Sequence, residues 1–190
     1  METQTILVIG ATGAQGGSVA KHLLSTGKFR IKALTRNPNS NKATWLKEAG
    51  AEVVQGNLND LKSLETVMQG CDGVFGMTNF WEHFNSEYQH GKNIVDTAVK
   101  SGVRVLVLST LPSYEKLTGG KFNVPHFETK HALQEYASTV KPDTIFFHPA
   151  FYYENFLTYF VPQKNENGAY VFSFPQGNTK LAGYPNVSCN

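Results

Sequence analysis

The sequence predicts an α/β fold built on a doubly wound parallel sheet. Short apolar runs alternate along the chain with amphipathic stretches of helical length, a pattern typical of strand–helix–strand units. The run 103–108 is nearly continuous in hydrophobicity, as the central strands of parallel sheets are. Because crossovers between parallel strands are right-handed almost without exception, these units favour the doubly wound topology.

The expected elements follow in order from the N-terminus. The apolar run 5–10 (TILVIG) predicts the first strand, and the segment after it predicts a helix over residues 15–25. Further strands are expected at 29–34, 52–55, 74–77, 103–108 and 144–147. Helices are expected between them at 42–49, 61–68, 87–100 and 126–138. Gly70 is typical of the residue that ends a helix.

The sequence changes in character after Pro149. Residues 151–160 are rich in aromatic side chains, which we expect to pack between two lobes rather than to enclose a ligand, and 170–174 has the pattern of a strand. We therefore predict a main domain over residues 1–150 and the beginning of a smaller second lobe, for a substrate or a partner, over residues 151–190.

Composition excludes several classes of protein. Hydrophobic residues make up 41% and charged residues 17% of the chain, and the net charge is +2 without a basic cluster, so no direct nucleic-acid binding is expected. No apolar stretch approaches the roughly 18 residues of a membrane span, and no signal peptide is expected from the N-terminal residues. The two cysteines, Cys71 and Cys189, and the scattered histidines lack metal-ligand spacing. The expected location is the cytoplasm, with the nucleus as an alternative.

A glycine-rich turn follows the first strand and opens the first helix. Its residues are Gly10, Ala11, Thr12, Gly13, Ala14, Gln15 and Gly16. In a dinucleotide-binding Rossmann domain, Gly10 would permit the tight turn, Gly13 would let the backbone approach the pyrophosphate, and Gly16 would let the helix pack on the sheet. The pyrophosphate would accept hydrogen bonds from free N–H groups at the helix N-terminus. The alternative is a plain strand-to-helix turn without a ligand.

The end of the second strand indicates which dinucleotide is bound. A site that prefers NAD places Asp or Glu there, about 20 residues after the glycines, to hold the ribose 2′-hydroxyl. Residues 35–38 (TRNP) contain no carboxylate, whereas the Arg36 guanidinium is suited to a 2′-phosphate. Ser40 and Lys42 are close enough in sequence to assist. We therefore predict NADP(H) rather than NAD(H), unless Arg36 is only a surface residue.

With these motifs identified, the sequence resembles the NmrA-like family, atypical relatives of the short-chain dehydrogenases and reductases. The resemblance extends over residues 5–179, and the sequence is similar to redox-sensor proteins of that family. It rests on GATGAQGGSVA (10–20), LTRNP (34–38), GAEVVQGNLND (50–60), TNFWE (78–82), HFETK (126–130), YYENF (152–156) and PQK (162–164). The match fades after Thr179, so the chain resembles a C-terminally truncated member, and its second lobe would leave apolar surface uncovered.

The resemblance implies a set of cofactor contacts beyond the turn. Arg36 and Ser40 would bind the 2′-phosphate, Asn57 and Leu58 would lie beside the adenine, and Thr78 and Asn79 would lie near the ribose. The nicotinamide side would be flanked by Lys130, Tyr152, Tyr153, Glu154 and Asn155. The family commonly has Asp at the position of Asn57, so this contact is a departure. The implied function is an NADP(H)-binding redox sensor that reports cofactor state to a regulatory protein partner, with a homodimer as a further expectation.

The residue pattern that related reductases use for catalysis is only partly present. Related reductases use a Tyr-x-x-x-Lys pair to move a proton to or from the substrate oxygen. Here Lys130 is present, but His126 stands four residues earlier in place of the tyrosine. His126 could act as the acid and Ser109 could orient a carbonyl, or His126 only begins a helix and Lys130 only binds the ribose. The leading hypothesis is therefore a regulator without turnover. The alternatives are an NADPH-dependent reductase of small carbonyls or quinones and a truncated chain that folds poorly.

Overall fold

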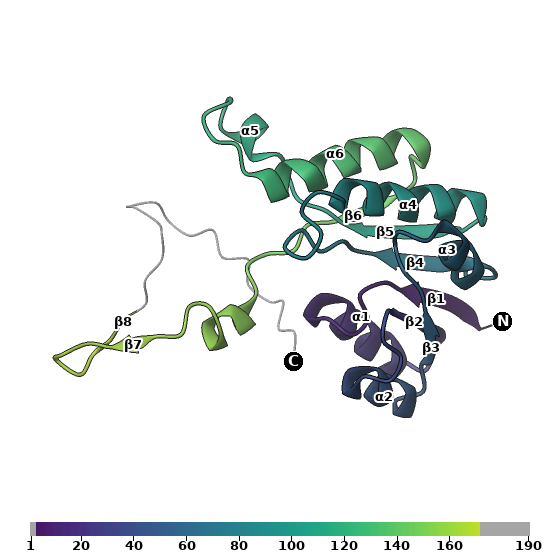
Figure 1. Cartoon of the computed structure of the whole chain (residues 1–190), viewed down its shortest axis with the longest axis horizontal. Helices are drawn as coiled ribbons and strands as arrows, with labels where there is room; N and C mark the ends of the chain where they lie inside the picture. Colours follow the sequence, from purple (N-terminus) through teal and green to yellow (C-terminus); the bar gives the residue numbers. More distant parts are fainter. Residues whose placement is uncertain (1–2, 172–190) are drawn as a thin grey trace. The chain divides into compact units, whose positions relative to one another are not determined.

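A six-stranded parallel sheet forms the centre of the structure, a computed structural model that describes residues 3–171 (Figure 1). The strand order is β3-β2-β1-β4-β5-β6, and every neighbouring pair is parallel. The strands are β1 (Gln4–Val8), β2 (Phe29–Thr35), β3 (Glu52–Gln55), β4 (Gly73–Gly76), β5 (Val105–Ser109) and β6 (Ile145–Phe147). This arrangement confirms the predicted doubly wound sheet. The winding direction reverses between β1 and β4, which is where ligands of such sheets bind.

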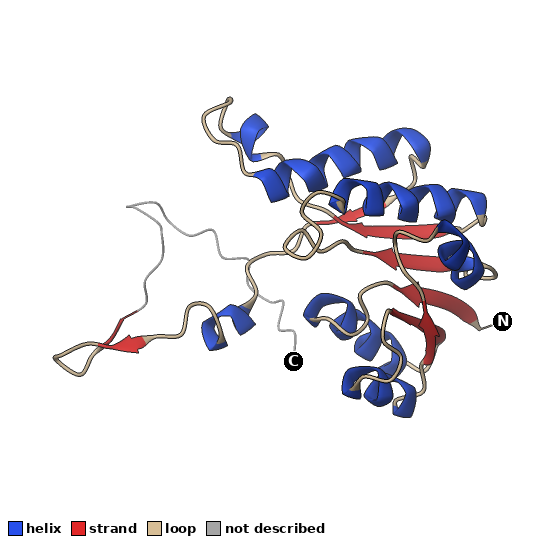
Figure 2. Ribbon diagram, viewed as in Figure 1, coloured by secondary structure: helices blue, strands red, loops and turns tan. Residues whose placement is uncertain are grey.

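Helices cover both faces of the sheet (Figure 2). They are α1 (Ala14–Ser25), α2 (Asn41–Glu48), α3 (Leu61–Met68), α4 (Glu87–Lys100), α5 (Tyr114–Leu117) and α6 (Pro125–Val140). Figure 1 shows α1 and α2 on one face and α3, α4 and α6 on the other. Each face has its own apolar core, because alternate residues of β1 point in opposite directions. Leu7 packs with α3, α4 and α6, whereas Val8 packs with α1 and α2.

The element boundaries differ from the predicted ones mainly at the strand ends. β1 ends at Val8 rather than at residue 10, because the chain already turns at Gly10. α5 is a four-residue helix that was not expected from the sequence. Its N-terminus is capped by the Ser113 hydroxyl, which accepts from the Lys116 amide. α6 extends to Val140, two residues beyond its predicted end.

The chain divides into two compact units, Met1–His148 and Pro149–Asn190. The described part of the second unit contains a 3-10 helix, η1 (Tyr153–Leu157), and an antiparallel pair, β7 (Gln163–Lys164) and β8 (Tyr170–Val171). The strand predicted at 170–174 is therefore present in its first two residues, and the rest of it lies outside the described residues. Among residues 3–171, no helix is long and apolar enough to span a bilayer.

Candidate functional site

The glycine turn between β1 and α1 is tightly folded. Gly10 has φ +73°, a conformation that glycine adopts without strain, and a Cβ there would lie 2.4 Å from Met77 Sδ. The Gly13 amide donates to the Gly10 carbonyl at 2.9 Å, and Gly13 caps α1 without a side-chain hydrogen bond. The first amides of α1 are therefore left without a side-chain acceptor, as a site for an anion requires.

Gly16 brings the first helix against this turn. A Cβ on Gly16 would lie 2.4 Å from the Gly10 carbonyl oxygen and 2.8 Å from that of Ile9. Both neighbours are backbone atoms, so they could not move aside as a flexible side chain would. This contact supports the packing role expected of Gly16.

A cavity of about 410 Å³ opens at the carboxyl ends of β1, β2 and β4, next to the glycine turn. It therefore lies at the reversal point of the sheet, where ligands of doubly wound folds bind. The predicted cofactor residues that line it are Gly10, Thr12, Gly13, Arg36, Ser40, Asn57, Leu58 and Asn79. The turn, the end of the second strand and the loop after the fourth strand thus meet in one place.

Other predicted cofactor residues do not line this cavity. Ala11 is buried in the apolar core beside α1, and Ala14 begins that helix. Gln15 is only 8% exposed, and its Nε2 has no hydrogen-bond partner among the described residues. Thr78 and Lys130 are bound to each other, as described below. Tyr152, Tyr153, Glu154 and Asn155 belong to the second unit, where the last three form part of η1, and their contact with a cofactor stays a prediction.

Arg36 meets a carboxylate that the sequence analysis did not predict. Its Nη2 lies 2.5 Å from Glu82 Oε1, in the loop between β4 and α4. The other oxygen of Glu82 accepts from Asn79 Nδ2 at 3.4 Å, and Glu82 lines the cavity together with Arg36. The hydrogen bond from Arg36 holds the pKa of Glu82 below its usual value, so the carboxyl is ionised at neutral pH.

Two more donors lie beside Arg36 in the cavity wall. The Ser40 hydroxyl accepts from the Ala43 amide at 3.3 Å and caps α2. An oxygen that accepts in this way can still donate its own hydrogen. Lys42 also lines the cavity. Arg36, Ser40 and Lys42 together form a basic corner suited to a phosphate.

His90 is a second residue of this site that the sequence analysis did not predict. Its side chain is 1% exposed, its Nε2 lies 2.6 Å from Asn59 Oδ1, and its ring packs on His83. Burial lowers the pKa of His90, so the ring is neutral at pH 7. His90 Nδ1 has no hydrogen-bond partner among the described residues. No group of His, Cys, Asp and Glu within residues 3–171 could hold a metal ion.

Lys130 is held in a buried polar network. Its Nζ lies 2.8 Å from Glu87 Oε1, 2.9 Å from the Thr78 carbonyl oxygen and 3.0 Å from Thr78 Oγ1. The Thr78 hydroxyl in turn donates to Glu87 Oε1 at 2.7 Å. Since an ammonium group has three N–H donors, these contacts engage all of them. Lys130 therefore joins α6 to the first residue of α4.

His126 lies one turn before Lys130, in an aromatic cluster. Its ring contacts those of Phe80, Trp81 and Phe127, with centroid distances of 5.5, 5.2 and 4.9 Å. Burial lowers the pKa of His126, so the protonated ring that a proton donor requires is less populated at neutral pH than in a free histidine. Ser109, the other candidate for catalysis, is buried at the end of β5.

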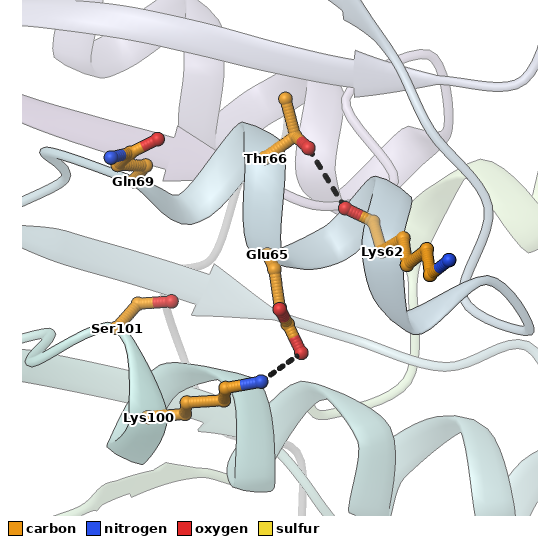
Figure 3. A pocket seen from close by; sticks show the side chains of 6 residues that line it. All are labelled: Lys62, Glu65, Thr66, Gln69, Lys100 and Ser101. Carbon is orange, nitrogen blue, oxygen red and sulfur yellow. Dashed lines mark hydrogen bonds and ion pairs between the residues drawn. The ribbon is translucent and has the colours of Figure 1, made fainter.

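A larger hollow, of about 590 Å³, lies away from this site between α3 and α4 (Figure 3). Its side chains are mostly exposed. Figure 3 shows Glu65 and Lys100 pointing toward each other across it, and their charged atoms are 2.6 Å apart. The other dashed line joins the Thr66 hydroxyl to the Lys62 carbonyl oxygen within α3. The hollow contains no glycine turn or buried polar group, and we assign no function to it.

The sheet order, the glycine turn and the cavity at the reversal point define a Rossmann-type α/β domain. The model of the NmrA-like family matches residues 2–183, and the chain belongs to that family.

Relatives of known sequence agree with this assignment. The chain is 36% identical over 171 residues to an NmrA-like family domain-containing protein of Dictyostelium discoideum. The alignment covers 87% of this chain and 57% of the relative. It is 40% identical over 162 residues to the NmrA-like family domain-containing oxidoreductase hkm9 of Aspergillus hancockii, with 82% and 48% covered. The chain thus spans about half the length of the curated relatives that it matches.

Solved structures share the fold. NmrA, a negative transcriptional regulator, superposes in complex with NADP with a TM-score of 0.76 at 22% identity, over 90% of this chain and 53% of that protein. The triphenylmethane reductase of Citrobacter sp., in complex with NADP(H), gives a TM-score of 0.66 at 23% identity, over 82% and 52%. At these identities the likeness shows the fold alone.

Proposed function

We propose that this chain binds NADP(H) at the cavity beside the glycine turn and acts as a regulatory domain, whose conformation or association with a protein partner follows cofactor occupancy. The observation that carries the proposal is that Arg36, Ser40 and Lys42 line the same cavity as Gly10 and Gly13. A dinucleotide that carries a 2′-phosphate needs both features, one for the pyrophosphate and one for the additional phosphate.

The residues present fit such a cofactor. The first turn of α1 has free amides and no capping side chain. Free amides at the N-terminus of a helix are the donors that a phosphate group accepts from. The complexes of NmrA with NADP and with NAD, and of the triphenylmethane reductase with NADP(H), support the class of ligand.

A regulatory rather than a catalytic role is supported by Lys130. When bound, NADPH would supply a hydride, and reduction of a carbonyl or quinone also needs a proton, which a positioned side chain delivers faster than water does. All three N–H donors of Lys130 are already engaged by Thr78 and Glu87, and releasing them would leave the buried Glu87 carboxylate without its cation. His126, in the position of the missing tyrosine, lies within an aromatic cluster.

An NADPH-dependent oxidoreductase is the second candidate, since the fungal relatives FrzB and hkm9, at 38% and 40% identity, are named as oxidoreductases. The two candidates differ in turnover. Steady oxidation of NADPH in the presence of a panel of quinones and small carbonyls would establish the reductase. Binding of NADPH without oxidation is the result expected for the regulator.

Calorimetric titration with NADP⁺, NADPH, NAD⁺ and NADH tests the binding proposal directly. In Arg36→Asp we expect the affinity for NADP⁺ to fall roughly a hundredfold, because a carboxylate replaces the cation that faces the phosphate. The affinity for NAD⁺ should stay or improve. Arg104→Asp, at an exposed arginine outside the cavity, is the matched control and should leave both affinities unchanged. Equal losses for both dinucleotides in Arg36→Asp would remove Arg36 from the phosphate site.

A further inference from the structure

We propose that the Glu82 carboxylate occupies the 2′-phosphate subsite of Arg36, so that NADP(H) displaces it from the guanidinium whereas NAD(H) leaves it in place. The proposal rests on the proposed function, because it concerns the discrimination between two dinucleotides at the same cavity. It makes Glu82 a specificity-determining residue, although it lies on a different element from the arginine.

The geometry places both charged groups in the wall of one cavity. Arg36 Nη2 is 2.5 Å from Glu82 Oε1, and both residues line the cavity together with Ser40 and Lys42. A carboxylate and a phosphate bind the planar guanidinium fork in the same way, through charge-assisted hydrogen bonds. They also repel each other when they share one cation, since both are negative. A 2′-phosphate can therefore bind Arg36 fully only after Glu82 has moved away.

NAD(H) is favoured by a carboxylate at this corner of the cavity rather than by a free cation. Its ribose carries a 2′-hydroxyl, and sites that prefer NAD supply a carboxylate at the end of the second strand to accept a hydrogen bond from it. The end of β2 carries Arg36 in this chain, but Glu82 brings a carboxylate to the same corner from the loop after β4. With Glu82 in place the corner is suited to NAD(H), and with Glu82 displaced it is suited to NADP(H).

Any movement of the loop that accompanies displacement of Glu82 is confined to its middle, because its ends are fixed. Thr78 and Glu87, on either side, are fixed by the buried network around Lys130. Glu82 itself is 42% exposed, and its neighbour Trp81 is 79% exposed, with its ring 5.2 Å from that of His126. Trp81 should therefore respond to the 2′-phosphate without any contact with it.

The first measurement compares dinucleotide affinities in Glu82→Gln by calorimetry. Gln keeps the size of the side chain but removes the charge that competes with the phosphate. The affinity for NADP⁺ should rise roughly tenfold, a usual size for coupling between two ligands, and the affinity for NAD⁺ should stay within about twofold or fall. The matched control is Glu65→Gln, which removes the carboxylate of the Glu65–Lys100 pair outside the cavity (Figure 3) and should change neither affinity.

The second measurement follows tryptophan fluorescence in a Trp45→Phe background, which leaves Trp81 as the only tryptophan of the chain. NADP⁺ should shift the emission of Trp81, whereas saturating NAD⁺ should leave it close to that of the free protein. In Glu82→Gln the free protein should already show part of the shift.

An unchanged ratio of NADP⁺ to NAD⁺ affinity in Glu82→Gln would overturn the proposal while the proposed function stands. So would an equal shift of Trp81 emission with both dinucleotides in the unsubstituted loop. If the unsubstituted chain bound neither dinucleotide, the proposed function would fail, and this inference with it.

Discussion

Two ion pairs hold the loop between β4 and α4, and they differ in their surroundings. Glu82 pairs with Arg36 at 2.5 Å, and Glu87 pairs with Lys130 at 2.8 Å. The side chains of the first pair are 42% and 57% exposed, whereas those of the second are 1% and 13% exposed. A glutamate therefore pairs with a cation once in contact with water and once within the protein.

These surroundings determine which pair can take part in binding. An exposed pair contributes little to stability, so its partners exchange readily for a ligand of the same charge. A buried pair is different, because removal of one member leaves a charge without compensation in a medium of low dielectric constant. We therefore expect the Arg36–Glu82 pair to affect ligand affinity and the Lys130–Glu87 pair to affect folding.

The largest expected effect is that of breaking the buried pair. Lys130→Ala should lower the free energy of unfolding by roughly 3 kcal/mol or more, because Glu87 would remain buried without its cation. Urea denaturation followed by circular dichroism measures this change. Lys100→Ala, which removes the cation of the exposed Glu65–Lys100 pair, is the control and should lower stability by about 1 kcal/mol at most.

The stability of Lys130→Ala also decides how a loss of its activity can be interpreted. A loss of NADPH oxidation in Lys130→Ala would indicate a catalytic lysine only if the variant were still folded under the assay conditions. A variant as stable as the original chain would contradict the buried network and restore Lys130 as a candidate for direct contact with the cofactor.

The fold could be predicted from the sequence because its signals are local. The alternation of apolar runs and helical stretches predicted the parallel sheet. The turn from Gly10 to Gly16 comes directly after a buried strand in the chain. The position of Arg36 could also be predicted, since it lies in the residues TRNP (35–38), which directly follow the predicted strand at 29–34. Each of these inferences uses residues that are neighbours in the chain.

The partners of the two cations could not be predicted in the same way. Glu82 and Glu87 lie in a loop and at a helix start, where acidic residues are common and carry no specific signal. One signal was available for Glu82, because β2 and β4 both neighbour β1, so the segments after them meet at one edge of the sheet. Lys130 was assigned by resemblance to the Tyr-x-x-x-Lys pair, a pattern that contains no information about burial.

A second way to test the buried pair is to remove the hydroxyl that bridges it. Thr78 Oγ1 donates to Glu87 and accepts from Lys130, and the residue is buried. Thr78→Val keeps the shape and should lower the free energy of unfolding by roughly 1–3 kcal/mol, because two buried polar groups lose a partner. The control is Thr129→Val, at an exposed hydroxyl that donates to the Pro125 carbonyl oxygen, with an expected change within about 0.5 kcal/mol. Equal effects would mean that the network adds nothing beyond a single surface hydrogen bond.

A smaller effect on stability is expected when the pH is lowered, because His126 lies half-buried in the aromatic cluster. Burial holds the pKa of His126 below the value of 6.5 that it has when exposed. As the pH falls below 6.5, the unfolded chain therefore binds a proton at this residue before the folded chain does, and stability decreases. Unfolding should be measured between about pH 7.5 and about pH 5.5, in the original chain and in His126→Gln. The variant should lose less stability on acidification, although the burial of His90 keeps part of the dependence. Identical slopes would place His126 in contact with water.

The smallest expected effect is on the stability contributed by the exposed pair. Glu82→Gln should change the free energy of unfolding by less than about 1 kcal/mol, the usual range for ion pairs in contact with water. Glu65→Gln, which breaks an exposed pair of similar length between α3 and α4, should give a change of the same size. Thermal and urea unfolding of both variants without ligand measures this. A loss in Glu82→Gln as large as that in Lys130→Ala would mean that Glu82 fixes the loop instead of exchanging with a ligand. A small loss together with a changed preference between dinucleotides is the combination expected if this carboxylate acts in binding and the buried one acts in folding.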